Sequence, residues 1–260
     1  MSLLDFCPAG PEWRMPWDAL LDEYACLREL HGCPQDPVHH AEGDVGTHTR
    51  LVCEELVRLE AWRALDERER RTLFAAAVLH DVAKPECTKR EDDGRITSRG
   101  HSRKGAIKAR GLLWRERVPF EAREEVCGLI AVHQVPYWLI DRPDVRRKAV
   151  EASWTTRGDR LALLAEADVR GRICADRQRL LDNVGLFAEQ LREMGLPGPP
   201  VAVRLGAGAG SVLRRREARA GGRGPRSDAL RGGGDVRLAG VGQGPPCPRA
   251  LRRVGARVAG

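Results

Sequence analysis

Apolar side chains in the first 200 residues recur at the spacing of an α-helix, and this periodicity limits what the chain can fold into. Alternation typical of a strand never extends beyond a few residues, so no sheet is expected. Three segments show the helical spacing most clearly: Val126, Leu129, Ile130 and His133; Leu161, Leu164, Ala165 and Asp168; and His48, Val52, Leu56 and Leu59. With further helices expected near 17–30, 102–117, 143–152 and 174–194, the pattern predicts an all-α helical bundle.

One more helix has signals at both ends. Asp66 is expected to cap it, because its carboxylate can accept hydrogen bonds from the free N–H groups of the first turn. The helix should run through His80 and end at the Lys84-Pro85 step, since the residue before a proline avoids the helical backbone. The run AAAVLHDVAKP is apolar enough for this helix to be buried.

The last 60 residues differ in composition from the rest. Residues 201–260 contain 13 arginines, no lysine, no aromatic residue and no isoleucine. Such a segment cannot bury enough apolar surface to offset the loss of chain entropy. We therefore expect three parts: a helical lead-in at 1–34, a domain at 35–195, and an Arg/Gly-rich, disordered or poorly packed tail at 196–260.

Three explanations for this tail stay open. It could bind RNA through its arginines, in which case binding should weaken steeply with salt and vanish when residues 201–260 are deleted. It could be a solvated extension. It could also be the out-of-frame translation of a GC-rich gene, which we favour because most residue types that it lacks depend on A/T-rich codons. Sequencing the gene around codons 195–205 tests the last explanation.

The tail also accounts for the basic charge of the chain. The net charge is +7, but the first 200 residues alone carry −3, so no broad cationic surface is expected there. No segment is long and apolar enough to span a membrane, and the start lacks the pattern of a signal peptide. The eight cysteines form no C-x-x-C pair, which argues against a disulfide scaffold or a Cys₄ zinc site. These features predict a cytoplasmic protein.

Polar side chains interrupt three of the apolar helix faces. His48, His133 and Asp168 occupy positions that should face the core. Burying an imidazole or a carboxylate costs several kcal/mol unless it is paired or bound to a metal. One such residue is usually just hydrogen-bonded, but three on separate helices indicate ligands that converge on a metal ion inside the bundle.

A His-Asp dipeptide at the end of the apolar run belongs to a longer ordered set: His48, His80-Asp81, His101, His133 and Asp168. The segments around these residues are HHAEGDVGTHTRLV, HDVAKP, GHSRKGA and LLAEADVRGR. In this order and setting, residues 35–175 resemble the HD superfamily of metal-dependent phosphohydrolases. They are similar to the HD regions of bacterial tRNA nucleotidyltransferases and poly(A) polymerases, and to the HD module of two-part RNA end-repair proteins that also contain a polynucleotide kinase.

The resemblance implies a role for each member of the set. The residues that match the metal-binding H…HD…D pattern are His48, His80, Asp81 and Asp168. His101 and His133 would bind a second metal ion or the substrate phosphate. Mixed imidazole and carboxylate ligands suit Mn²⁺, Fe²⁺, Co²⁺, Ni²⁺ or Zn²⁺ better than Ca²⁺ or Mg²⁺. One or two such ions would activate a water molecule, and Asp81 would be catalytic as the bridge between them.

Neighbouring cationic residues have two interpretations each. Lys84 could act catalytically by neutralising charge on the phosphoryl oxygens, or it could be a solvated lysine at a helix end. Arg103 and Lys104 lie near the predicted start of a helix, where they could bind the substrate phosphate. His39 and His40 could line the substrate opening, with His40 as the candidate contact, or they could be exposed loop residues.

Tyr137 and Trp138 follow His133 and could stack on a nucleotide base. We expect instead that a short helix, which Pro136 would start, packs both aromatic side chains into the core.

The resemblance implies a divalent-metal-dependent phosphohydrolase of nucleotide or RNA-terminal phosphoesters, and we favour 2′,3′-cyclic phosphodiesterase and 2′-phosphatase activity. Hydrolysis of free nucleotides (dNTP, NMP or guanosine tetraphosphate) stays open, as does a non-catalytic module that binds nucleotide or RNA. The sequence contains no G-x-x-x-x-G-K-[ST] phosphate loop. We therefore expect the HD module alone, with a nucleotide or an RNA 3′ end as its substrate, and any kinase or nucleotidyltransferase activity in a separate partner.

Overall fold

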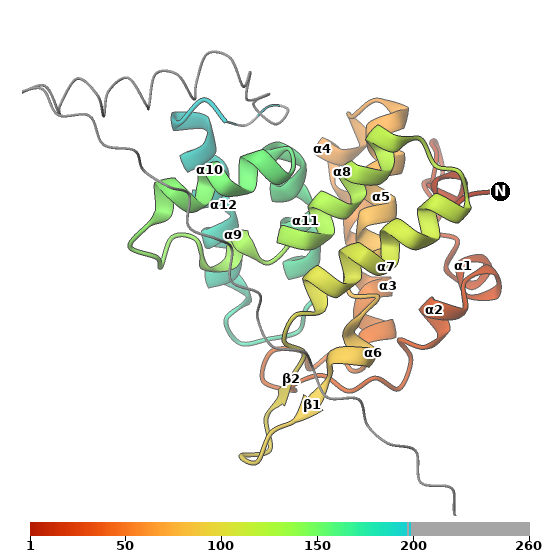
Figure 1. Cartoon of the computed structure of the whole chain (residues 1–260), viewed down its shortest axis with the longest axis horizontal. Helices are drawn as coiled ribbons and strands as arrows, with labels where there is room; N and C mark the ends of the chain where they lie inside the picture. The colour runs from red at the N-terminus through yellow and green to blue at the C-terminus, as the bar shows by residue number, and fades with distance from the viewer. Residues whose placement is uncertain (197, 199–260) are drawn as a thin grey trace, which may run out of the picture. The chain divides into compact units, whose positions relative to one another are not determined.

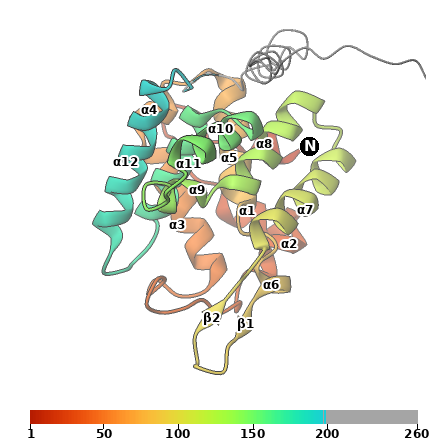
Figure 2. The same cartoon turned by 60° about the vertical axis from the view of Figure 1, so that its left-hand side comes forward.

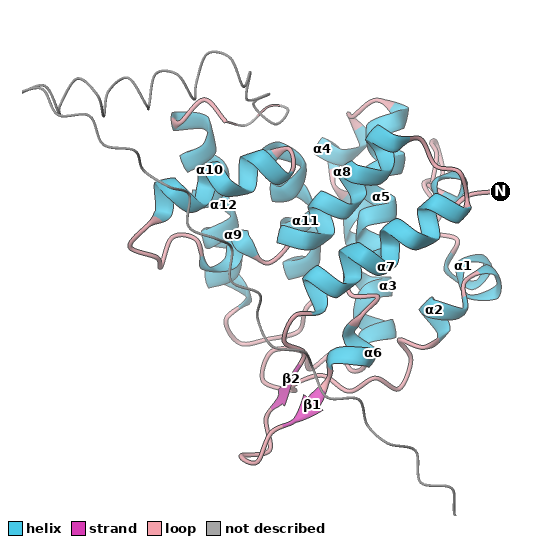
Figure 3. Ribbon diagram, in the orientation of Figure 1, coloured by secondary structure: helices cyan, strands magenta, loops and turns pink. Residues whose placement is uncertain are grey.

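The computed structural model of the protein describes residues 1–196 and 198, so the predicted tail lies almost wholly outside the described residues. Helices predominate in the described part (Figures 1 and 3), which confirms the all-α prediction. A 3₁₀ turn at Leu3–Phe6 comes first. The helices that follow are α1 (Trp17–Glu23), α2 (Ala25–Arg28), α3 (Val45–Arg58), α4 (Glu60–Arg63), α5 (Glu67–Leu79), α6 (Lys84–Cys87), α7 (His101–Arg115), α8 (Phe120–Val132), α9 (Val135–Trp138), α10 (Val145–Thr155), α11 (Gly158–Arg170) and α12 (Arg177–Glu193).

Helix α5 lies at the centre of the bundle. All its residues from Thr72 to Leu79 are buried, because α3, α8 and α11 pack around it. A helix that is apolar on every face is typical of such a position. Asp66 caps the helix as predicted, since its Oδ1 accepts a hydrogen bond from the Glu69 N–H at 2.8 Å. Helix α5 therefore delivers the residues that follow it to the interior.

The end of α5 differs from the prediction. The helix stops at Leu79, well before the Lys84-Pro85 step, and residues 80–83 form a turn. Pro85 lies instead in the first turn of α6. Proline is tolerated there because the first N–H groups of a helix have no partner within it. The proline thus marks the start of a new helix and does not end the preceding one.

Helix α11 contacts both α3 and α12 (Figure 2). Gly171, directly after α11, makes the approach to α3 close, because a Cβ atom at this position would lie 2.8 Å from the backbone nitrogen of Val52. This packing brings His48, near the start of α3, beside Asp168 of α11.

The chain before residue 35 contributes to the same core, since Leu3, Leu20 and Leu27 are fully buried. Strands β1 (Lys89–Arg90) and β2 (Ile96–Thr97) pair in an antiparallel hairpin that projects from one end of the bundle (Figure 1). The sequence does not predict this hairpin, because two-residue strands are too short to show alternation. The seven described cysteines are free thiols. Among the described helices, none has the length and apolar character needed to cross a membrane.

Candidate metal centre

The six ligand-type side chains singled out from the sequence lie together inside the bundle. Each is at most 5% exposed. They come from five helices or from the residues that directly follow them: His48 near the start of α3, His80 and Asp81 just after α5, His101 at the first position of α7, His133 just after α8, and Asp168 in α11. Residues far apart in the chain thus form one buried polar cluster, which we call the His/Asp cluster.

Asp81 lies at the centre of the His/Asp cluster. Its Oδ2 is 3.2 Å from Nε2 of His80 and 3.8 Å from Nε2 of His48. Its Oδ1 is 3.2 Å from Nε2 of His101 and 3.9 Å from Nε2 of His133. The two oxygens of one carboxylate therefore face two different pairs of imidazoles.

The main chain orients three of the four rings. Each Nδ1–H donates a hydrogen bond to the carbonyl oxygen three residues earlier, at 2.7–2.8 Å: His80 to Ala77, His101 to Ser98 and His133 to Ile130. A carbonyl oxygen can only accept, so the Nδ1 atoms carry the protons. The Nε2 atoms that face Asp81 consequently keep their lone pairs when the rings are neutral, as a metal ligand requires.

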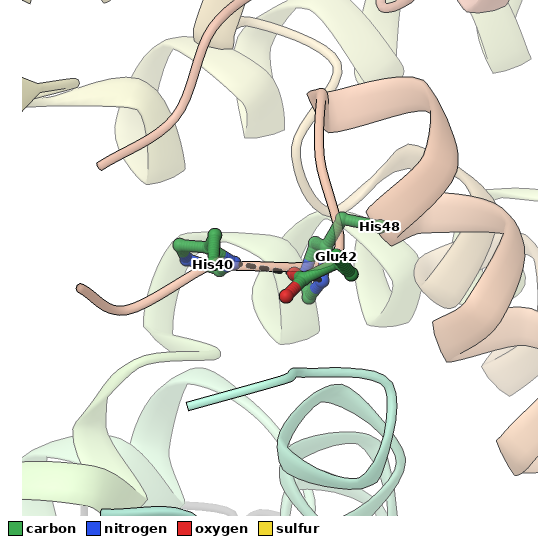
Figure 4. A group of neighbouring side chains, drawn as sticks. All are labelled: His40, Glu42 and His48. Carbon is green, nitrogen blue, oxygen red and sulfur yellow. Dashed lines mark hydrogen bonds and ion pairs between the residues drawn. The ribbon is translucent and has the colours of Figure 1, made fainter. Parts of the chain in front are cut away.

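Glu42 lies against the fourth ring. His48 is inside α3, where the nearby carbonyl groups already accept the hydrogen bonds of the helix. Its Nδ1 lies 2.8 Å from Oε1 of Glu42, and the same oxygen accepts a hydrogen bond from Nδ1 of His40 at 2.8 Å (Figure 4). The other Glu42 oxygen accepts from the Ile173 N–H at 2.8 Å. Burial opposes ionisation of Glu42, but these contacts keep its pKa below the usual range.

The donor set fits a divalent transition metal. Among the described residues, Nε2 of His48, Nε2 of His80 and Oδ1 of Asp81 are buried and have no hydrogen-bond partner. Orphaned buried atoms of this kind are costly unless something binds them. Three groups of three residues have ligand atoms within 4.8 Å of one another: His48, His80 and Asp168; Asp81, His101 and His133; and His40, Glu42 and His48. Imidazole nitrogens with carboxylate oxygens are the ligands that such ions prefer.

Arg172 and Tyr137 hold the carboxylate of Asp168. The Nε of Arg172 donates to Oδ1 at 2.9 Å and its Nη2 to Oδ2 at 3.0 Å, while the hydroxyl of Tyr137 donates to Oδ2 at 2.5 Å. Burial opposes the charge on Asp168, but Arg172 and His48 keep the pKa of this carboxyl well below its ordinary value. Asp168 is therefore ionised and fixed in orientation.

Lys84 is buried, so the interpretation of a solvated lysine is wrong. Its Nζ lies 2.8 Å from Oδ2 of Asp81 and donates to Oε1 of Gln35 at 2.7 Å. Burial opposes the charge on Asp81, but His80 and Lys84 keep the pKa of this carboxyl well below its ordinary value. Lys84 also lines a cavity, and its ammonium group therefore connects the cluster to the opening.

This cavity has a volume of about 290 Å³ and reaches the cluster at His101. Its other polar lining includes His39, His40, Arg99 and Arg172. The two cationic residues predicted to contact substrate, Arg103 and Lys104, are exposed on α7 and do not line it. Helical geometry explains the position of Arg103, because two steps along a helix turn the side chain by about 200° away from that of His101. Arg99, which sequence reasoning misses, is the cationic residue from this segment that lines the cavity.

The two aromatic residues after His133 separate. Tyr137 is buried as expected, but Trp138 is 45% exposed and lines the cavity. The expectation that both pack into the core is therefore wrong for Trp138. Adjacent positions of the short helix α9 cannot face the same side.

Sequence reasoning also misses four side chains as partners of the cluster: Gln35, Glu42, Tyr137 and Arg172. Only Arg172 carries a local signal, because it lies four residues after Asp168, the spacing of helical ion pairs. The other three reach their partners from loops or from a separate helix, and periodicity contains no information on such contacts.

Comparison with known proteins agrees with this geometry. Residues 45–164 match the family model of the HD domain. Three curated relatives are each named Multifunctional CCA protein. The first, from Thioalkalivibrio sulfidiphilus (strain HL-EbGR7), is 28% identical over 211 residues, which cover 75% of this chain and 49% of the relative. The second, from Halorhodospira halophila (strain DSM 244 / SL1), is 31% identical over 215 residues, covering 77% and 47% respectively.

The third relative, from Actinobacillus pleuropneumoniae serotype 5b (strain L20), is 32% identical over 149 residues, which cover 55% of this chain and 34% of the relative. This chain thus spans about half the length of the first two relatives. The match of residues 45–164 to the HD domain confirms the resemblance to the HD superfamily noted from the sequence.

Proposed function

We propose that the protein is a divalent-metal-dependent phosphohydrolase that acts on nucleotide or RNA-terminal phosphoesters, with 2′,3′-cyclic phosphodiesterase and 2′-phosphatase activity. The observation that carries this proposal is the buried carboxylate of Asp81, on which four imidazole Nε2 atoms converge at the base of a cavity. The similarity to proteins named Multifunctional CCA protein agrees with the resemblance to HD regions of tRNA nucleotidyltransferases. It favours an RNA end over a free nucleotide as substrate.

The residues that would hold a first ion are His48, His80, Asp81 and Asp168. His101 and His133, with the second oxygen of Asp81, would hold a second ion or contact the phosphate directly. When bound, such an ion lowers the pKa of a water molecule and polarises a phosphoryl oxygen. In this reaction the water oxygen bonds to phosphorus as the phosphorus–oxygen bond to the leaving ribose oxygen breaks.

The remaining side chains of the site would position the phosphate. Lys84 and Arg99 place positive charge on the cavity wall, where it would stabilise negative charge that builds on the phosphoryl oxygens. Gln35 fixes the Lys84 ammonium through its hydrogen bond. Arg172 and Tyr137 keep the Asp168 carboxylate facing His48, so that the ligand atoms need little rearrangement.

The test is an activity assay of the purified full chain with Mn²⁺, Co²⁺ or Ni²⁺. The substrates are 2′,3′-cyclic AMP, 2′-AMP and 3′-AMP, compared with dATP, AMP and guanosine tetraphosphate. We expect metal-dependent release of product from the first two, lost in Asp81→Asn. Asp93→Asn is the matched control, because Asp93 is exposed in the hairpin turn and bonds only its neighbour Arg95.

Other outcomes would contradict this proposal at different levels. Hydrolysis of only dATP, AMP or guanosine tetraphosphate would show that the proposed RNA-terminal substrate is wrong, while metal-dependent phosphohydrolase activity would stand. No hydrolysis of any substrate, together with substoichiometric metal after supplementation, would indicate a non-catalytic binding module.

A further inference from the structure

Helix α7 and the residues that flank it carry an excess of positive charge, most of which lies outside the cavity. Between Arg99 and Arg117 the chain has seven Lys and Arg residues and one carboxylate, Glu116. That carboxylate is engaged elsewhere, since its Oε2 accepts a hydrogen bond from the N–H of Leu3 at 2.9 Å. This charge is local to one segment of the first 200 residues, whose overall net charge is −3.

Five of these cations are exposed and unpaired: Arg99, Arg103, Lys104, Arg115 and Arg117. Among the described residues, no carboxylate lies within ion-pair distance of them; in this segment only Lys108 and Arg110 have such partners. Unpaired surface cations on a helix and directly beside its ends are suited to the phosphates of a nucleic acid backbone.

Two large aromatic side chains lie at the far end of the same helix. Trp114 is 67% exposed and Phe120, the first residue of α8, is 65% exposed. The buried guanidinium of Arg123 lies 4.7 Å from the ring centroid of Trp114 and 5.4 Å from that of Phe120. Glu124 accepts hydrogen bonds from both Arg123 and Arg110, which fixes this arrangement. The rings are thus held at the surface by a charged network.

Helix α7 begins at the cavity and leads away from it. Residues 98–101 line the cavity, and α7 begins at His101 (Figure 1). Its fifteen residues extend for about 22 Å from there towards Trp114. A chain whose end entered the cavity could therefore follow α7 away from it.

We infer that α7 and the start of α8 bind single-stranded RNA next to the terminal nucleotide, with phosphates on the unpaired cations and an unpaired base on Trp114 or Phe120. We call this the α7 surface. The inference rests on the proposed function for the identity of the partner. Single strands fit better than duplexes because their bases are free to stack on aromatic rings.

The test measures binding of the full chain, without metal, to a fluorescent single-stranded RNA that ends in an unmodified 3′-OH. Trp114→Ala should weaken binding by about 10-fold or more, as the loss of one stacked base predicts. The double variant Lys104→Ala/Arg115→Ala should lower the slope of log affinity against log salt by about 1.4, because each phosphate that is no longer neutralised changes the slope by about 0.7.

Matched controls lie on α10. Trp154 is 59% exposed, and Arg146 is exposed without an ion-pair partner among the described residues. Trp154→Ala and Arg146→Ala should bind RNA like the unmodified chain. Thermal melting of every variant confirms that the fold is intact. Ultraviolet crosslinking followed by peptide mapping should place the RNA on residues 101–123.

Three outcomes would overturn the inference: α7 variants that bind like the controls, crosslinks confined to residues 201–260, or α7-dependent binding to anionic phospholipid vesicles without binding to RNA. The experiment uses neither a scissile phosphate nor a metal ion. Its failure is therefore distinct from failure of the proposed hydrolysis, which is measured on mononucleotides.

Discussion

At the scale of single residues, Glu42 distinguishes His48 from the other histidines of the His/Asp cluster. Its carboxylate lies between the rings of His48 and His40 and also accepts a main-chain hydrogen bond. A carboxylate in this position fixes the tautomer and orientation of a metal-binding imidazole and raises its basicity. We therefore regard Glu42 as a positioning residue for His48.

Glu42→Gln should weaken metal binding by about 10- to 100-fold, because the amide no longer supplies a negative charge to the His48 ring. Titration calorimetry of the metal-free protein with Mn²⁺ or Co²⁺ measures this. Asp44→Asn is the matched control, because the Asp44 carboxylate caps the same helix through the Thr47 N–H. Asp44 meets His48 through its main-chain carbonyl, which accepts from the His48 N–H and is kept in the variant. Equal losses of metal affinity in both variants would show that Glu42 acts only through the stability of α3.

His133→Ala tests the division of the His/Asp cluster into two groups. Because His133 faces only the Oδ1 side of Asp81, we expect a strong loss of turnover while one metal ion per chain stays bound. Elemental analysis of protein loaded with metal and then desalted gives the stoichiometry. His31→Ala removes an imidazole outside the cluster and should change neither value. Loss of all metal in His133→Ala would contradict the division.

At the scale of secondary-structure elements, the contact between α3 and α11 decides whether His48 meets Asp168. The two helices approach closely at Gly171, where a Cβ atom would lie 2.8–3.0 Å from backbone and side-chain atoms of Val52. Backbone atoms cannot yield as a flexible side chain can. Any side chain at position 171 must therefore push the helices apart.

Gly171→Ala should lower the free energy of unfolding by about 1–3 kcal/mol through overpacking, and should weaken metal binding as well. Gly185→Ala is the matched control, because a Cβ atom in this part of α12 meets nothing within 4 Å. That replacement should raise the free energy of unfolding by about 0.5–1 kcal/mol, since alanine is the better helix former. Denaturant unfolding measures both. An unchanged free energy of unfolding in Gly171→Ala would mean that α3 and α11 can move apart without cost.

The sequence predicts a helix well where the signals lie within that helix, such as the spacing of its apolar residues and the cap at its start. Apolar spacing and the Asp66 cap place α5, and the repeat that ends at Asp168 places α11. Three members of the cluster, His48, His133 and Asp168, are visible in the sequence as polar residues on apolar helix faces. The other three are singled out by the ordered set that resembles the HD superfamily. It does not reveal where α5 ends, because Pro85 starts α6 and the turn at residues 80–83, which ends α5, carries no proline. Nor does it reveal the contacts of Gln35 or Tyr137, which depend on how separate elements pack.

At the scale of the whole molecule, the cluster draws its ligands from five helices, so a bound ion would connect most of the bundle. In the absence of metal, Lys84 and Arg172 provide the positive charge that Asp81 and Asp168 need in a buried site. Metal binding should stabilise the folded state further.

Addition of Mn²⁺ or Co²⁺ at about 100 times its dissociation constant should stabilise the full chain by about 2.7 kcal/mol. For a folded part of this size, that corresponds to a rise in Tm of roughly 5–10 °C, and chelation should reverse it. In Asp81→Ala the metal-dependent rise should disappear together with turnover, while Asp93→Ala keeps both. Differential scanning calorimetry provides the test. A full metal-dependent rise in Asp81→Ala would place the ion elsewhere.

The hydrogen bonds from His80, His101 and His133 to carbonyl oxygens three residues earlier have a consequence for mutational robustness. Main-chain acceptors are present whatever side chain a position carries, so these three imidazoles can tolerate substitution of the residues that hold them. His48 lacks this protection, because a single acidic side chain faces its outer nitrogen. Random mutagenesis should therefore find the site resilient around three of its histidines and fragile at the fourth.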